Sequence, residues 1–435
     1  MTDLTSVTLR SLQRLYTDIA VQHGGGRDGA SREDSTLRNL VELSRLTRDS
    51  VLSEHAASVY EQLTEGFQRS YRVIELVLRA AEQFPGLLPD RGYLENEQRR
   101  PQRNKIGLEY DHGLFVSWIL ADPTCGHHLL HAMTLPHPAA AGALQRLRDY
   151  DSVDLGTVQV RRRGIVGEVV LGNHRFLNAE DDRSLRALEL AVDLVLLDDR
   201  IEIGVLRGGE ATHPKYAGNR VFSSGLNLTD LYEGRISFTA FFLERELGLL
   251  NKLLRGHPTG SPHRELEQRR EKPWISVVDA FAIGSGVQLL LATDYVIAEQ
   301  AAYFSLPAAR IGVLSGTAGL RLARLLGDSP AREALTTGRA YPVESSAGRL
   351  LMNRVVAPDQ MDSAIAAAVF DHTSSGRTAT RATRRELRSA SEPADDLRRF
   401  LATYARDQAE CVFDPGLLSN LDNHSHHPVR VNRTA

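Results

Sequence analysis

The first third of the chain places apolar residues at the spacing of a helix face. Leu37 and Leu40 begin the pattern, and it resumes over residues 59–67 and 73–78. Apolar positions three and four residues apart predict amphipathic helices with one buried face. No spacing typical of a catalytic site stands out in this part. We therefore expect residues 1–155 to form a helical N-terminal extension that supports assembly or covers a site.

From Val158 onward the apolar period changes from that of helices to that of strands. Alternation over residues 158–160 and 165–171 predicts two strands joined by a turn at Gly164. Polar residues 178–182 then predict the start of a helix. The elements predicted from there are, in chain order, that helix to Val195, a strand at 203–207, a helix at 237–254, a strand at 274–281, a helix at 287–292 and a strand at 295–298.

Alternating strands and helices predict an α/β core over residues 156–357, built from ββα units. After this core we expect a C-terminal helical region at 358–412 and a polar, poorly ordered tail at 413–435. Within the helical region, the arginines of residues 377–388 are expected on a solvated helix face.

The overall composition narrows the class of protein. The 435 residues are 42% hydrophobic and 25% charged, with a formal net charge of −3. This balance is typical of a globular protein and gives no broad positive surface, so we expect no nucleic-acid partner. No apolar run approaches the roughly 20 residues that span a bilayer, and the first residues do not resemble a signal peptide. We therefore expect a cytoplasmic location and no membrane partner.

The sequence gives no support for metal chemistry. The two cysteines, Cys125 and Cys411, are too few and too far apart for a disulfide framework or a thiolate site. His127, His128 and His131 lack a nearby carboxylate or cysteine pattern, so surface or packing roles are expected. We expect no bound metal.

The stretch Gly284-Ser285-Gly286 lies between a predicted strand and a predicted helix. Such a turn leaves backbone N–H groups free at the helix N-terminus. Free N–H groups in this position bind a phosphate or stabilise an oxyanion. A tight packing turn is the alternative, and the turn by itself does not separate these possibilities.

Several further motifs follow one another in a distinctive order. They are Asn178-Ala179, the Phe-Ser-Ser-Gly-Leu-Asn-Leu loop at 222–228, the glycine turn at 284–286, the segment 302–312, and Gly338-Arg339 followed by 347–356. Their order resembles that of the crotonase, or enoyl-CoA hydratase/isomerase, superfamily over about residues 158–369. The resemblance implies a crotonase-like ββα spiral as the core of the α/β fold.

The resemblance also implies a use for the two glycine turns. One backbone N–H from each turn, those of Leu226 and Ser285, would form an oxyanion hole around the thioester carbonyl of an acyl-CoA. Loss of one such donor costs on the order of 3 kcal/mol. Further substrate contacts are implied for the residues around these two amides, namely Ser224, Gly225, Asn227, Leu228, Thr229, Gly284 and Gly286.

Ser285 departs from the family pattern, which has glycine at this amide. If the position requires a positive φ, serine adds strain on the order of 1 kcal/mol. Gln288 and Ala308 depart from it too, since they stand where hydratases carry their paired acid and base carboxylates. Without these carboxylates, hydration of a double bond is not expected.

A narrower resemblance covers nearly the whole chain. It rests on the helical N-terminal extension, on His213-Pro-Lys-Tyr216 and on the segments 220–228, 241–248, 287–291 and 303–309. These resemble the cofactor-independent (3,5-dihydroxyphenyl)acetyl-CoA 1,2-dioxygenases of glycopeptide-antibiotic biosynthesis. The resemblance implies that an arylacetyl-CoA reacts with O2 through an enolate to give 3,5-dihydroxyphenylglyoxylate and CoA, with no metal, flavin or other cofactor.

Residue roles follow from the same resemblance. Glu180, Arg245 and Gln288 would hold the two ring hydroxyls, and Gln288 is counted among the catalytic residues. Taken singly, Glu180 could instead cap its helix, and Arg245 could pair with Glu244 or Glu246. Contacts to CoA are implied for His213, Pro214, Lys215 and Tyr216. An apolar pocket for O2 is implied for Val313 and Leu314.

Two alternatives to the dioxygenase stay open. One is another enolate reaction on an acyl-CoA, such as isomerisation or thioester hydrolysis, and the other is a catalytically silent paralogue that binds acyl-CoA. Departures from the subfamily at Ile311, Ser315 and Gly319 leave the aryl group open, and no residue is identified as the enolising base. Proteins of this superfamily usually assemble as trimers or pairs of trimers, so we expect a homo-oligomer (trimer or hexamer).

Overall fold

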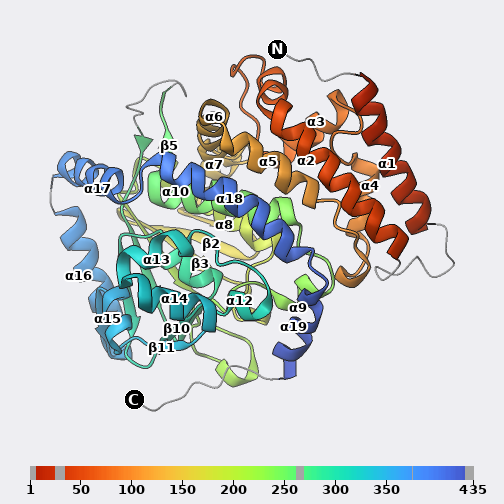
Figure 1. Cartoon of the computed structure of the whole chain (residues 1–435). Helices are drawn as coiled ribbons and strands as arrows, with labels where there is room; N and C mark the ends of the chain where they lie inside the picture. Colours follow the sequence, from red (N-terminus) through yellow and green to blue (C-terminus); the bar gives the residue numbers. More distant parts are fainter. Residues whose placement is uncertain (1–5, 25–34, 261–268, 375, 427–435) are drawn as a thin grey trace. The chain divides into compact units, whose positions relative to one another are not determined.

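The computed structural model describes residues 6–24, 35–260, 269–374 and 376–426 (Figure 1). The chain forms two compact units. The first contains Met1–Met133, Leu228–Glu244 and Ala394–Asp422, and the second contains Thr134–Asn227, Arg245–Pro393 and Asn423–Ala435. The domain boundaries expected from the sequence follow the chain in order and stay a prediction.

The first unit is built from helices. Those that begin in it are α1 (Ser6–Gly24), α2 (Ser35–Leu63), α3 (Val73–Gln83), α4 (Arg91–Gln98), η1 (Gln102–Asn104), α5 (Tyr110–Ala121), α6 (Pro123–Thr134), α9 (Leu228–Tyr232), η4 (Phe238–Leu243), α18 (Ala394–Val412) and α19 (Gly416–His426). Because α19 falls in the stretch expected to be a poorly ordered tail, that expectation is wrong for this helix. Residues 427–435 lie outside the described residues.

Helix α5 is central to the first unit, since it packs against both α2 and α18. At the contact with α18, a side chain on Gly113 would lie 2.8 Å from the Ala405 carbonyl oxygen, so only glycine allows this approach. Asp111 of α5 is buried, accepts a hydrogen bond from the Tyr16 hydroxyl at 2.6 Å and pairs with Arg48 at 3.0 Å. Close helix packing and paired buried charges therefore hold this unit together.

The second unit is organised around a seven-stranded sheet. Its strands are β1 (Ser152–Asp154), β2 (Val158–Arg163), β3 (Val166–Leu171), β4 (Ile203–Gly208), β7 (Trp274–Val278), β9 (Tyr295–Glu299) and β12 (Arg354–Val356), and this is also their order in the sheet. The first three strands are antiparallel, and β3, β4, β7, β9 and β12 run parallel. Gly164 joins β2 to β3 with a φ of +61°, which confirms the predicted turn.

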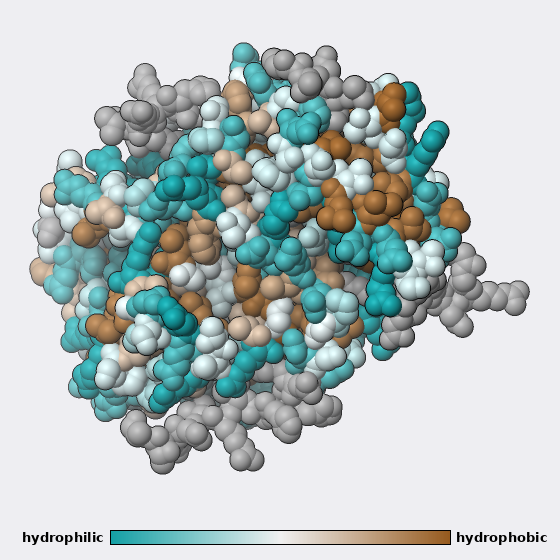
Figure 2. All heavy atoms as spheres, in the orientation of Figure 1, coloured by the Kyte–Doolittle hydropathy of each residue, from teal (hydrophilic) through white to brown (hydrophobic). Residues whose placement is uncertain are grey.

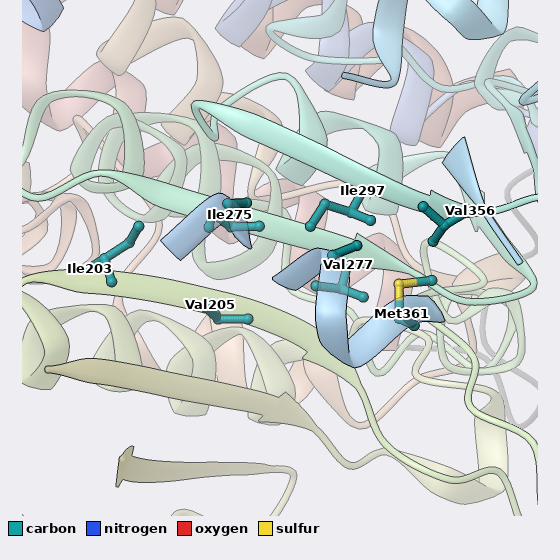
Figure 3. Packing of buried hydrophobic residues seen from close by; sticks show 9 residues of the cluster. Ile203, Val205, Ile275, Val277, Ile297, Val356 and Met361 are labelled. Carbon is teal, nitrogen blue, oxygen red and sulfur yellow. The ribbon is translucent and has the colours of Figure 1, made fainter. Parts of the chain in front are cut away.

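Helices cover both faces of this sheet. On one face lies α8 (Asp182–Leu197), and Gly167 of the sheet leaves room for the Val195 side chain of this helix. A Cβ added to Gly167 would lie 2.8 Å from a Val195 methyl group. On the opposite face, α16 (Met361–Thr373) packs on buried side chains of the parallel strands (Figure 3), namely Ile203, Val205, Ile275, Val277 and Ile297. Strands buried on both faces read as continuous apolar runs, which is why β4 and β7 are visible in the sequence.

A second sheet contains β8 (Phe281–Ile283), β10 (Tyr303–Ser305) and β11 (Ala340–Pro342). The single strand predicted at 274–281 is therefore wrong at its end. After β7, Asp279 pairs with Arg207 at 3.1 Å, and Ala280 has a φ of +61°. This bend moves the chain from the first sheet into β8 of the second, directly before the glycine turn.

The predicted helix at 237–254 is confirmed, but its turns are wider than expected, since η4 and η5 are π-helical. Wide turns of this kind are frequent near functional sites. The other elements that begin in the second unit are α7 (Ala140–Tyr150), η2 (His174–Phe176), η3 (Pro214–Tyr216), η5 (Arg245–Leu249), α10 (Leu250–Arg255), β5 (His257–Pro258), β6 (Arg269–Arg270), α11 (Ser285–Leu290), α12 (Ala308–Ile311), α13 (Ala318–Leu326), α14 (Asp328–Thr337), α15 (Ser346–Leu351), η6 (Pro358–Gln360) and α17 (Arg377–Ser391).

The arginines of α17 differ from expectation. Arg384 pairs with Asp294 at 2.7 Å and with Glu271 at 3.1 Å, and Arg388 pairs with Glu271 at 2.9 Å. The Glu271 carboxylate is only 1% exposed, so it needs cationic partners to stay charged. The expected solvated face is therefore wrong for these two arginines, which attach α17 to the segment before β7.

Among the described residues, no helix combines the length and the apolar character needed to cross a membrane. Figure 2 shows, on one face, hydrophilic residues interspersed with smaller groups of hydrophobic ones. The cytoplasmic location expected from the sequence stays a prediction.

Candidate active site

The two glycine turns lie against each other in the second unit. The Ser223 N–H donates to the Phe281 carbonyl at 3.4 Å, and the Ser223 carbonyl accepts from the Ile283 N–H at 3.0 Å. Gly225 has a φ of +88°, and a Cβ there would lie 2.7 Å from the Ile283 carbonyl oxygen and 3.6 Å from the Gly284 Cα. Only a residue without a side chain permits this approach. Pairing with β8 thus joins two turns that are far apart in the sequence.

The backbone amides of Leu226 and Ser285 have no backbone acceptor in the part of the chain that the structure describes. The chain on either side of Leu226 is held, since the Glu180 N–H donates to the Gly225 carbonyl at 2.7 Å and the Asn227 N–H donates to the Glu180 carbonyl at 2.8 Å. Ser285 is the first residue of α11, where an amide lacks an intrahelical partner. The turns therefore present two uncommitted N–H groups, the arrangement that an oxyanion hole requires.

Ser285 does not have the backbone strain that was considered for it. The positive φ of this turn falls on Gly284, at +53°, and Ser285 is absent from the residues with positive φ. Serine is therefore compatible with this amide, because it begins the helix in an ordinary conformation. Glycine is required at Gly286 instead, where a Cβ would lie 2.8 Å from the Cβ of Ser223. The buried Ser285 hydroxyl has no hydrogen-bond partner among the described residues.

Arg245 is the centre of a buried polar cluster and is 2% exposed. Its Nε donates to Glu180 at 2.7 Å, and its Nη2 donates to Glu180 at 3.2 Å and to the Ser285 carbonyl at 2.8 Å. Nη1 donates to Gln288 and, at 3.4 Å, to Glu246. These contacts use all five N–H groups of a guanidinium. Glu180, Arg245 and Gln288, which the sequence resemblance groups, thus lie together beside the second turn.

The helix-cap role considered for Glu180 is wrong. Asp181 caps α8 instead, since its carboxylate accepts from the Ser184 N–H at 2.8 Å. Glu180 is buried and directs its carboxylate to Arg245. Arg245 does contact its sequence neighbour Glu246, but its shortest carboxylate contact is with Glu180.

The loop expected to contact CoA lies at the surface. His213, Pro214 and Lys215 are exposed, and the Lys215 ammonium lies 5.2 Å from the centre of the Tyr216 ring. The Tyr216 ring in turn packs edge-on to Phe281, with 5.4 Å between ring centres. Because Phe281 begins β8, this exposed loop adjoins the strand that leads to the second turn.

The remaining expected contacts have different surroundings. Ser224 Oγ donates to the Phe176 carbonyl at 2.9 Å, so this hydroxyl supports the first turn from within. Val313 is buried, whereas Leu314 is 38% exposed. Leu228, the last residue of the first motif, and Thr229 after it begin α9 in the first unit.

Two supports of the site were not given a role from the sequence. Asn178, with a φ of +57°, accepts a hydrogen bond from the Ser223 hydroxyl on its carbonyl at 3.1 Å and so fixes the first turn. Glu246 is 3% exposed and accepts from the Thr317 N–H at 2.9 Å. Its spacing of three residues from Leu243 and four from Leu250, which are both buried, was the one indication in the sequence that it is buried.

Among the described residues, no group of three or more His, Cys, Asp or Glu side chains is arranged to hold a metal ion. The packing role expected for His128 is confirmed. Its Nδ1 is hydrogen bonded to the Tyr60 hydroxyl at 2.7 Å, and its Nε2 to the Phe67 carbonyl at 3.1 Å.

Comparison with known proteins identifies the family. A family model described as enoyl-CoA hydratase/isomerase matches residues 216–408. A (3,5-dihydroxyphenyl)acetyl-CoA 1,2-dioxygenase of Amycolatopsis orientalis is 39% identical over 395 residues, which cover 91% of this chain and 89% of that protein. The chain belongs to the enoyl-CoA hydratase/isomerase, or crotonase, family. The family expected from the sequence motifs is thereby confirmed.

Other crotonase-family proteins match a smaller part of the chain. A probable enoyl-CoA hydratase of Rhizobium meliloti is 29% identical over 206 residues, which cover 47% of this chain and 70% of that protein. The crystal structure of an enoyl-CoA hydratase from Mycobacterium avium subsp. paratuberculosis has a TM-score of 0.51 at 19% identity, and the match covers 62% of this chain and 99% of that one. This likeness shows the crotonase fold, as expected from the sequence.

Proposed function

We propose that this crotonase-family protein is a cofactor-independent dioxygenase that converts (3,5-dihydroxyphenyl)acetyl-CoA and O2 to 3,5-dihydroxyphenylglyoxylate and CoA. One observation carries the proposal: the buried cluster of Glu180, Arg245 and Gln288 is joined directly to the turn of Ser285. It occurs in a chain that is 39% identical to a protein named for this reaction. The cluster offers polar groups to an aryl ring, and the turns offer N–H groups to a thioester.

The first step uses the amides of Leu226 and Ser285. Both donate to the thioester oxygen as the α-carbon loses its proton and negative charge develops on that oxygen. Fixed donors aimed at a developing oxyanion typically contribute about 3 kcal/mol each. The aryl ring and the polarised carbonyl both delocalise the new charge, so the product of this step is an electron-rich enolate.

The enolate supplies the electrons that O2 needs. One electron passes from the enolate to O2, and the two radicals combine to form an α-peroxide. The terminal peroxide oxygen attacks the thioester carbon, and the CoA thiolate leaves and takes up a proton. Loss of the second α-hydrogen as the O–O bond breaks leaves the α-keto acid. One thioester and one O2 thus give one keto acid and one CoA without an outside reductant.

Recognition of the ring hydroxyls falls to acceptors near Arg245, because its N–H groups are already bonded to protein atoms. The Glu180 carboxylate accepts two bonds from Arg245 and keeps further lone pairs for a phenolic O–H. Arg245 itself orients Glu180 and Gln288 and, through the Ser285 carbonyl, the second turn. Aryl recognition and carbonyl activation therefore depend on the same guanidinium.

The CoA portion is proposed to lie along the exposed loop at 213–216. Lys215 supplies a positive charge for a phosphate, and the Tyr216 ring supplies a face for the adenine. The apolar side chains of Val313 and Leu314 are proposed to border the O2 site.

A homo-oligomer, a trimer or a pair of trimers, is the proposed assembly. Light scattering coupled to size-exclusion chromatography measures the number of subunits.

Oxygen uptake tests the proposal. Protein treated with a chelator and free of flavin absorbance is mixed with (3,5-dihydroxyphenyl)acetyl-CoA, while dissolved O2 and free thiol are followed together. We expect one CoA released for each O2 consumed, and the same rate with and without the chelator. Phenylacetyl-CoA is the matched control, since it lacks only the ring hydroxyls.

Other outcomes of this experiment select the alternatives. CoA release without O2 indicates a thioester hydrolase, and exchange of the α-hydrogen with solvent deuterium without CoA release indicates an isomerase-like reaction. Tight thioester binding with neither event indicates a silent paralogue. Each of these results overturns the dioxygenase.

A further inference from the structure

The turn between α12 and α13 lies directly on the side chain of Glu246. Glu246 follows Arg245 in η5 and is 3% exposed. Its Oε2 accepts from the Thr317 N–H at 2.9 Å, and its Oε1 lies 3.4 Å from Arg245 Nη1. Gly316 has a φ of +50°, and a Cβ there would lie 2.2 Å from Glu246 Oε1. The backbone of this turn therefore packs against the carboxylate with no space for a side chain.

These contacts close a ring of hydrogen bonds. Arg245 Nη1 donates to Gln288 Oε1, and Gln288 Nε2 donates to the Ser315 carbonyl. Two residues later, the Thr317 N–H donates to Glu246, which returns the ring to Arg245. Gln288 and Glu246 thus hold the two ends of the same short turn against one guanidinium.

We propose that Glu246 is a positioning residue that clamps the turn at 313–317 against the cluster of Glu180, Arg245 and Gln288, the proposed aryl site, and so couples CoA release to O2 uptake. This inference rests on the proposed dioxygenase function. Val313 and Leu314 are the apolar residues of the turn. Among the described residues, Glu246 makes no contact with the amide of Leu226 or of Ser285. Its influence therefore passes through Arg245 and the turn.

The reason for the coupling is exclusion of water from the bound thioester. With the turn held, O2 is the reactant that meets the enolate. With the turn released, water reaches the thioester carbon, and CoA leaves as the thiol while arylacetate forms. A loosened turn therefore raises the CoA released per O2 consumed above one.

Two substitutions of Glu246 test whether its hydrogen bonds hold the turn. Glu246→Ala removes both hydrogen bonds, and we expect it to lower kcat/KM by about 100-fold, as a misplaced substrate does. We also expect a larger rise in the KM for O2 than in the KM for the thioester, and more than one CoA per O2. Glu246→Gln keeps an amide oxygen for the Thr317 N–H, so it should restore the ratio toward one.

Glu189→Gln is the matched control. Glu189 is a buried carboxylate of the same unit, 4% exposed, and it pairs with Lys252 at 2.8 Å. If a general loss of stability caused uncoupling, this variant would show it too. We expect its ratio of CoA to O2 to stay at one.

Amide hydrogen exchange supplies a readout that needs no turnover. The peptide containing Thr317 should exchange faster in Glu246→Ala than in the wild type or in Glu189→Gln, since its N–H loses its acceptor. Unchanged exchange, or faster exchange with the CoA-to-O2 ratio still at one, would overturn the proposal. If the wild type consumes no O2, the proposed function fails on its own, while exchange still decides whether Glu246 holds the turn.

Discussion

Two buried cations on neighbouring helical segments have similar surroundings but different relations to the site. Arg245 in η5 is 2% exposed and lies between the carboxylates of Glu180 and Glu246. Lys252 in α10 is fully buried and pairs, at 2.8 Å in both cases, with two carboxylates of α8, those of Glu189 and Asp193. Burial, charge and pairing are therefore alike in the two clusters.

The contacts beyond the carboxylates separate them. Arg245 also donates to Gln288 and to the Ser285 carbonyl, so it touches the turn with the uncommitted amide. The second cluster instead extends to His257, which lies 2.8 Å from Asp193, and so attaches β5 to α8. Buried ion pairs by themselves do not identify a functional site. What distinguishes Arg245 is the set of groups that it contacts in addition to its carboxylates, namely Gln288 and the Ser285 carbonyl.

The largest expected effect on stability comes from the second cluster. Lys252→Met leaves two carboxylates buried without their cation, so the free energy of unfolding should fall by about 3–5 kcal/mol. Turnover per folded molecule should change little. Urea unfolding measures the first quantity, and an active-site titration the second. The exposed Lys215→Met is the control for stability, and an equal effect there would remove the basis of the comparison.

Arg245→Lys should instead impair activity. A single ammonium cannot make the forked contacts to Glu180, Gln288 and the Ser285 carbonyl, so both the proposed aryl site and the second turn lose their support. We expect kcat/KM for the dihydroxyphenyl thioester to fall about 100-fold, the size of one lost oxyanion donor. The fall should be smaller for phenylacetyl-CoA. Equal losses with both thioesters would show that Arg245 does not organise the aryl pocket.

Gly286→Ala tests the close packing of the two turns. The added Cβ would lie 2.8 Å from that of Ser223, so overpacking should cost about 1–3 kcal/mol of stability and separate the amides. Exchange of the substrate α-hydrogen should slow. Gly142→Ala is the control, since a Cβ in that helix meets nothing within 4 Å. It should stabilise the protein slightly, and slower α-hydrogen exchange there too would argue against a role of turn packing.

A smaller effect is expected from pH through His257. Burial lowers the pKa of His257 below its usual value, although the hydrogen bond to Asp193 opposes this. The unfolded chain, with a histidine pKa of about 6.5, therefore binds more protons than the folded one as pH falls below that value. Stability should decrease from about pH 7 toward the lower folded pKa. Urea midpoints across this range should fall less steeply in His257→Gln, and identical slopes would exclude His257.

Ser285→Gly should have the smallest effect. Because Ser285 has an ordinary backbone conformation, glycine relieves no strain there and should cost about 0.5–1 kcal/mol through greater freedom of the unfolded chain. The N–H donor is retained, so turnover should change little. A large gain in rate would mean that the Ser285 hydroxyl obstructs the thioester.

The backbone of the site was readable from the sequence because glycine patterns report local geometry. An added Cβ would lie 2.7 Å from the nearest atom at Gly225 and 2.8 Å at Gly286, and Gly225 and Gly284 both have a positive φ. The strain considered for Ser285 was misplaced by one residue, since the positive φ lies at Gly284. A glycine motif shows that a positive φ is needed in the turn, but the residue that adopts it depends on where the helix begins.

Side-chain partners were harder to predict because they depend on long-range packing. Arg245 has glutamates on both sides in the sequence, yet its shortest carboxylate contact is with Glu180, in a segment before α8. The role of Glu246 could not be predicted without knowing that the turn at 315–317 lies against its carboxylate. The bend at Ala280, which sends the chain into the second sheet, likewise follows an apolar run that reads as one strand.

The two donors proposed for the site are main-chain amides, which every residue except proline carries. Mutational drift at Leu226 or Ser285 therefore leaves the donors present, provided that the glycines beside them are kept. Selection can then replace the side chains around the proposed carbonyl site, as Gln288 and Ala308 at the positions of the hydratase carboxylates illustrate, and direct one enolate to different products. A lineage built on this fold inherits carbonyl activation almost unchanged, while its choice of reaction remains open to evolution.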